Sequence, residues 1–136
     1  MEFDSAFVQE WLRIADMDML TAEHMCEVHP APLEIICFHS HQVAEKLLKA
    51  YLFSRQVAPP KMHDLIRLCE LCMAQDPLFC ALAPTCGFLT LYGIQPRYPH
   101  DLQIDDNIAR LCLQYANQIK DFAPLAELRT APEQTE

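Results

Sequence analysis

Apolar side chains recur every three or four residues along most of this 136-residue chain, which is the spacing of one face of an α-helix. The first such run extends from Asp4 to about Val28, and further runs cover about residues 32–56, 62–72, 77–93 and 104–122. Proline-containing stretches, HPAP at 29–32 and APP at 58–60, separate the first three runs. The pattern predicts an all-α fold, an up-and-down antiparallel bundle of four to five helices.

The ends of these runs predict helix boundaries. His63 or Asp64 is a candidate N-cap, since an aspartate side chain accepts the free amide hydrogens of a first helical turn. The fourth run carries Pro84 and Gly87, and we expect it to kink or split there. Beyond Pro124 the sequence is polar and is expected to fray. We therefore predict one helical domain over residues 1–124 and a polar C-terminal tail over residues 125–136.

Charge is distributed unevenly along the chain. The net charge is −9, made up of −7 over residues 1–34, +3 over residues 35–67 and −5 over residues 68–136. An acidic surface repels a polyanion, so broad binding to a nucleic-acid backbone is disfavoured. Any nucleotide phosphate is expected near the basic middle segment.

The N-terminus and the cysteines indicate a cytoplasmic protein. MEFDSAFVQEWL is acidic where a secretory signal is basic, and no apolar stretch reaches the roughly 18 residues of a membrane span. The seven cysteines are odd in number and most lie at apolar positions of helical runs, where a reduced thiol packs as a small hydrophobe. We expect a reducing compartment and no contact with a membrane.

Neither a metal site nor a cofactor is predicted. Cys69 and Cys72 form a CxxC pair, but both fit the apolar pattern of their helix and no second pair at zinc spacing exists, so burial is favoured. Gly87 and Gly93 are the only glycines, which excludes the glycine-rich loops that usually cradle phosphates. A nucleotide would have to bind through side chains or helix N-termini.

His39 and His41 lie two residues apart in the second run. Residues two apart on a helix point about 200° apart, so the pair cannot chelate one ion. His39 follows the apolar positions of its helix and is interpreted as a hydrogen-bonded packing residue. His41 lies on the flank of the helix with Glu45, where a solvated or interface role is favoured over catalysis.

Arg97 and His100 lie in the proline-punctuated stretch QPRYPHD. An arginine that holds a phosphate and a histidine that moves a proton are the minimum equipment for cleaving RNA through its 2′-hydroxyl. Two such residues on one loop also occur by chance, and taken alone they are interpreted as solvated loop residues.

Three short motifs resemble the HEPN family in order and spacing. FHSHQVAEKLLKAYL at 38–52 is similar to the family's second-helix signature, an aromatic-His pair followed by Q-x-x-E-K-x-x-K-A. KMHDLIRLC at 61–69 resembles its H-D-L helix start, and RYP at 97–99 the tripeptide before its last helix. The resemblance covers roughly residues 4–123.

The resemblance implies a helical bundle that commonly forms homodimers and binds nucleotides, RNA or a separately encoded minimal nucleotidyltransferase in toxin–antitoxin or defence modules. It assigns a nucleotide-binding or partner-binding role to a set of five residues. Many members are metal-independent ribonucleases with an R-x(4–6)-H motif. Arg97 and His100 are instead spaced R-x(2)-H. The five residues are Lys46, Lys49, Glu45, His41 and Tyr98.

Three hypotheses about function follow. The first is a dimeric, non-catalytic HEPN domain that binds nucleotide or a partner. The second is a metal-independent ribonuclease in which Arg97 orients the phosphate and His100 transfers the proton. The third is a structural interaction module in which Lys46 and Lys49 only cover apolar surface and pair with the acidic first helix.

Overall fold

The computed structural model describes residues 5–93 and 103–130, which form six α-helices and one short 3-10 helix. No strand occurs in these two stretches, so the predicted all-α class is confirmed. No helix within them is long and apolar enough to cross a membrane. In chain order the elements are α1 (Ser5–Met25), α2 (Leu33–Ser54), α3 (Leu65–Gln75), η1 (Pro77–Leu82), α4 (Ala83–Gly93), α5 (Asp106–Asp121) and α6 (Ala123–Thr130).

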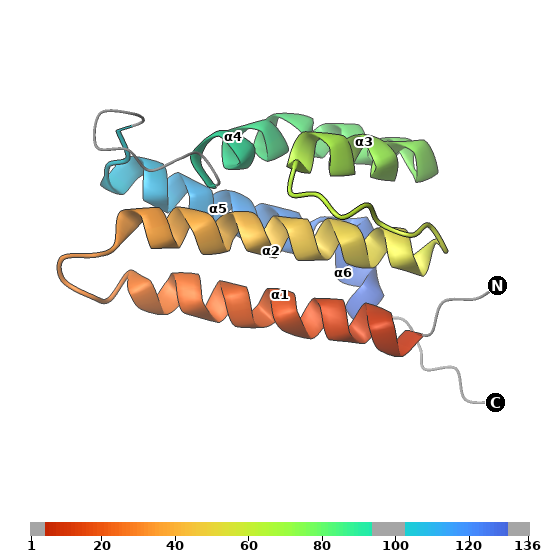
Figure 1. The fold of residues 1–136 in the computed structure, drawn as a ribbon, viewed down its shortest axis with the longest axis horizontal. Helices are drawn as coiled ribbons and strands as arrows, with labels where there is room; N and C mark the ends of the chain where they lie inside the picture. The colour runs from red at the N-terminus through yellow and green to blue at the C-terminus, as the bar shows by residue number, and fades with distance from the viewer. Residues whose placement is uncertain (1–4, 94–102, 131–136) are drawn as a thin grey trace.

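Helix α2 is the centre of the bundle. It packs against every other α-helix, with α1 antiparallel beside it, α5 behind it and α3 and α4 across its upper side (Figure 1). Its side chains are buried around most of its circumference, as expected of a helix with neighbours on several sides. Leu47, Leu48 and Leu52 are at most 1% exposed, and burial of each contributes about 1.5–3 kcal/mol to folding.

Aspartate caps start three of the helical elements. Asp64, one of the two predicted N-caps, accepts hydrogen bonds from the backbone amides of Ile66 (3.0 Å) and Arg67 (3.4 Å). Asp76 and Asp105 cap η1 and α5 in the same way. Each cap satisfies amide hydrogens that the first helical turn leaves without a partner.

The predicted break in the fourth run lies earlier than expected. The chain changes from 3-10 to α-helix at Ala83, and Pro84 occupies the first turn of α4, where the absence of its amide hydrogen costs nothing. Gly87 lies inside α4 and does not interrupt it. The run therefore does split, but neither Pro84 nor Gly87 ends a helix.

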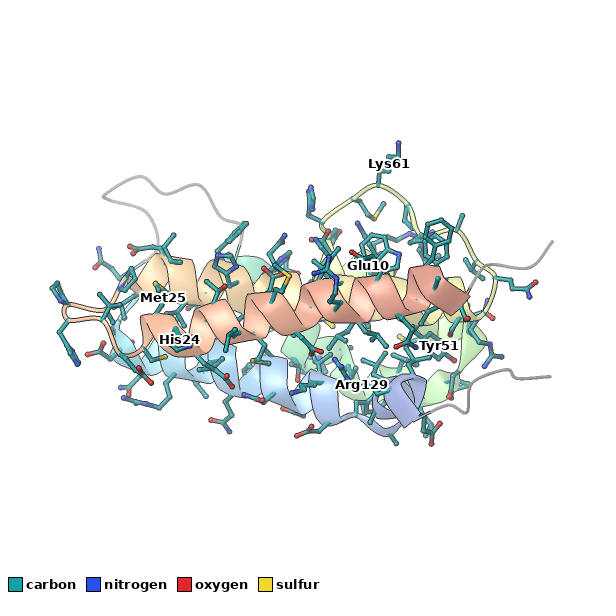
Figure 2. The ribbon with its side chains drawn as sticks, turned by 90° about the horizontal axis from the view of Figure 1, so that it is seen from below. Glu10, His24, Met25, Tyr51, Lys61 and Arg129 are labelled. Atoms are coloured by element: carbon teal, nitrogen blue, oxygen red, sulfur yellow. The ribbon has the colours of Figure 1, made fainter. Side chains whose placement is uncertain are left out.

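The predicted tail over residues 125–136 is wrong in its first part. Helix α6 begins before Pro124 and continues to Thr130, and Leu125 is 1% exposed. Arg129 holds α6 against α1 by donating to both carboxylate oxygens of Asp16, at 2.8 and 2.9 Å (Figure 2). Because this partner lies at the other end of the sequence, local composition could not reveal it.

The two glycines of α4 should respond oppositely to substitution. A Cβ on Gly93 would lie 2.3 Å from Cβ of His41 in α2, so Gly93→Ala must push the helices apart, and we expect a loss of about 1–3 kcal/mol in unfolding free energy. A Cβ on Gly87 meets nothing within 4 Å, so Gly87→Ala should add about 0.5–1 kcal/mol. Urea unfolding of both variants measures the effect, and equal effects would contradict the close approach of α4 to α2.

Candidate functional site

A buried carboxylate is the centre of the candidate site. Glu45 on α2 is only 1% exposed, yet its oxygens lie 3.0 Å from Nζ of Lys49, 3.0 Å from Nδ1 of His63 and 3.7 Å from Nζ of Lys46. We call these four residues the Glu45 cluster. A charge taken out of water is tolerated only when it is paired and hydrogen-bonded, and these contacts meet that condition.

The two lysines differ in how firmly they are held. Lys49 is one helical turn after Glu45, donates directly to it and lies with its ammonium 5.8 Å from the centre of the Trp11 ring on α1. Nζ of Lys46 lies farther from Glu45, at 3.7 Å, and the Lys46 side chain is 16% exposed. In the amide orientation that satisfies both groups, Gln42 donates to Glu45 and accepts from Lys46, each over 3.3 Å.

The position of Lys46 and Lys49 corrects one expectation. They were predicted to pair with acidic residues of the first helix if they had only a structural role. Instead, their acidic partner is Glu45 on their own helix, and Lys49 contacts α1 through an aromatic ring. The sequence pattern alone could not show that Glu45 turns inward between them.

His63 reaches the cluster from the loop between α2 and α3. Its Nδ1 lies 3.0 Å from both oxygens of Glu45, although its side chain is 69% exposed. Its backbone oxygen accepts a hydrogen bond from Nε2 of His41, at 3.0 Å. Two hydrogen bonds therefore fix this loop residue to α2, immediately before the Asp64 cap of α3.

Electrostatics keep Glu45 ionised. Burial acts to raise the pKa of this carboxyl, but hydrogen bonds from Lys49 and His63 and the charges of the two lysines outweigh burial and lower the pKa below its usual value. At neutral pH the cluster therefore contains one carboxylate facing two ammonium groups.

The surface role predicted for His41 is wrong. Its side chain is fully buried, with Nδ1 3.9 Å from Glu45, and Gly93 of α4 packs on its Cβ. Burial lowers the pKa of His41, and the nearby Glu45 carboxylate offsets this only in part. The ring is neutral at pH 7 and carries its proton on Nε2, which donates to the carbonyl of His63.

His39 was interpreted as a hydrogen-bonded packing residue, and this is confirmed only in part. Its Nδ1 lies 2.8 Å from the carboxylate of Asp18 on α1, but its side chain is 25% exposed. It lies at the edge of the α1–α2 contact and not in the core. Cys69 and Cys72, by contrast, are buried as predicted.

Arg97, Tyr98 and His100 lie outside the residues that the structure describes. The catalytic role of Arg97 and His100 therefore remains a prediction. Within residues 5–93 and 103–130, no group of three or more His, Cys, Asp or Glu side chains is arranged to hold a metal ion. Of the predicted binding residues, the structure brings Lys46, Lys49 and His41 close to Glu45. His63 and Trp11 also contact this group, and no binding role was predicted for them. The sequence feature that could have pointed to His63 is the H-D-L motif at residues 63–65.

The sequence was also compared with models of known protein families. The sequence model of a family described as HEPN domain matches residues 8–126, most of the chain. The chain belongs to the HEPN family. No curated protein and no solved structure gave a match. Three residues of the motif that resembles the HEPN second-helix signature, Glu45, Lys46 and Lys49, are part of the Glu45 cluster.

Removing the central charge should destabilise the protein. In Glu45→Gln the two largely buried ammonium groups lose their carboxylate, and we expect the free energy of unfolding to fall by about 3 kcal/mol, measured by urea denaturation. Glu70→Gln removes an exposed carboxylate paired with exposed Arg67 and should cost less than about 1 kcal/mol. Equal costs would contradict the burial of Glu45.

Stability should fall in two steps on acidification. His41 is neutral in the folded state but takes up a proton in the unfolded chain below its ordinary pKa of 6.5, so stability is lost as the pH falls below that value. Glu45 contributes stability above its ordinary pKa of 4.5 that is lost as the pH falls through its lowered folded pKa. The difference between the unfolding free energies of the parent and of Glu45→Gln should shrink below about pH 4.5. A constant difference from pH 7 to pH 3 would contradict the lowered pKa of Glu45.

Proposed function

We propose that this HEPN protein is a non-catalytic, homodimeric binding domain. Its ligand is a nucleotide or a protein partner, such as a minimal nucleotidyltransferase in a toxin–antitoxin or defence module. The observation that carries the proposal is the Glu45 cluster, in which residues of the family signature gather two ammonium groups around one carboxylate. The surplus positive charge lies in a chain with a net charge of −9, so it marks where an anionic group is attracted.

The burial of Lys49 and His41 argues against a catalytic role for these two residues. Lys49 and His41 are buried and hold other groups of the protein, as structural residues do. The R-x(4–6)-H motif of the ribonucleases in the family is not present, since Arg97 and His100 are spaced R-x(2)-H. The polar residues of α2 are thus accounted for without a reaction.

Exposed apolar side chains support association with another chain. Met17 and Leu20 lie three residues apart on α1 and are 54% and 55% exposed, and Leu78 on η1 is 62% exposed. Met17 and Leu20 are one helical turn apart, and a partner or a second copy that packs on α1 would cover both.

Affinity purification from the native host tests the proposal. We expect recovery of a homodimer with a stoichiometric second protein, or an intact mass increased by bound or attached nucleotide. Size-exclusion chromatography with light scattering measures the oligomeric state. A strict monomer that brings down no partner and shows no calorimetric response to nucleotides would overturn it.

The second candidate function is a metal-independent ribonuclease that uses Arg97 and His100. The sequence favours it: Arg97 and His100 in QPRYPHD pair an arginine that can hold a phosphate with a histidine that can move a proton. If the protein is such a ribonuclease, Arg97→Ala and His100→Ala should each abolish cleavage of single-stranded RNA. Equal cleavage by both variants and the parent would assign the activity to another site or to a contaminant.

A further inference from the structure

An exposed histidine held by a buried carboxylate is an unusual combination on the surface of this protein. His63 is 69% exposed, but its Nδ1 contacts both oxygens of Glu45, which is 1% exposed. The contact stabilises the buried carboxylate, and it also holds a mostly exposed ring at the surface in one position. The pairing fixes the orientation of a ring that would otherwise rotate freely.

The contact with Glu45 also determines which nitrogen of His63 is available. A carboxylate only accepts hydrogen bonds, so Nδ1 of His63 carries a proton and donates it. The other ring nitrogen, Nε2, has no hydrogen-bond partner among residues 5–93 and 103–130. The His63 ring is held in one orientation by Nδ1, so Nε2 can contact a ligand.

Lys46 is a second residue that contacts Glu45 and is partly exposed. Its Nζ lies 3.7 Å from the Glu45 oxygen that Lys49 contacts at 3.0 Å, so it is the more weakly held ammonium group. Since two ammonium groups face one carboxylate, the formal charge beside His63 is +1. Such a charge repels a metal ion and attracts an anion.

We propose that Nε2 of His63 and Nζ of Lys46 form the contact edge of a phosphate-binding site, with Glu45 as the residue that positions both. Lys46 would donate to one phosphate oxygen. In the imidazolium form of His63, which a bound anion favours, Nε2 would donate to another, and charge-assisted hydrogen bonds of this kind are the stronger ones. The inference rests on the nucleotide-binding form of the proposed function and assigns the phosphate of the nucleotide to this site.

Two substitutions of His63 separate contact from positioning. His63→Asn keeps a donor close to where Nδ1 meets Glu45 and removes Nε2, whereas His63→Gln keeps a donor near Nε2 and loses the bond at Nδ1. The ligands are inorganic phosphate, AMP and ATP, titrated calorimetrically into the full chain. We expect His63→Asn and Lys46→Gln each to weaken binding of AMP and ATP about tenfold or more, and His63→Gln to weaken it less.

Lys61→Gln is the matched control. Lys61 is two residues from His63 in the same loop and projects into solvent away from the bundle (Figure 2). Its removal changes the net charge as much as Lys46→Gln does, but affinity should change less than about twofold. Thermal unfolding of every variant checks that the fold is retained.

The outcomes distinguish this inference from the proposed function. Parental affinity for AMP and ATP in both His63→Asn and Lys46→Gln would overturn the site, and so would an effect of Lys61→Gln equal to that of Lys46→Gln. If the unmodified protein binds none of the three ligands but still co-purifies with a partner, the phosphate site is wrong and partner binding stands. Binding of inorganic phosphate that depends on His63 and Lys46 would support the site directly.

Discussion

The ionised carboxylate of Glu45 is the constraint on which this structure depends. A buried negative charge is costly unless cations and donors surround it, so α2 must bring Lys46 and Lys49 to it, and the loop after α2 must bring His63. The same loop accepts a hydrogen bond from His41 and then starts α3 at Asp64. One buried group thereby holds the loop before α3 on the central helix.

The central position of α2 explains why its polar residues are so closely paired. The helices around α2 bury four of its polar side chains, and a buried polar group must find a partner within the protein. These four are Ser40, His41, Glu45 and Lys49. Ser40 donates to the carbonyl of Ile36 at 2.8 Å, and His41 donates to the carbonyl of His63. Two residues of the motif that resembles the HEPN signature, Glu45 and Lys49, are therefore accounted for by the pairing of buried groups.

Much of the fold and part of the site could be predicted from sequence. The spacing of apolar residues by three and four predicted the helices. The net positive charge of residues 35–67 indicated the part of the chain that holds the Glu45 cluster. Both features depend on residues close together in the chain. The burial of His41 and the helix around Leu125 could not be predicted. His41 is covered by Gly93 of α4, and α6 is held by Asp16 of α1, and both contacts join distant parts of the sequence.

The sequence by itself determined the helical class, the aspartate cap of α3, the burial of Cys69 and Cys72 and the membership in the HEPN family. These properties follow from local spacing and residue type. Only the tertiary structure decided which charged residues turn inward and which exposed residue they meet. His63 joins Glu45, Lys46 and Lys49 because the loop after α2 folds back on that helix. The free energy of a buried charge depends on all its neighbours in space, including those distant in sequence.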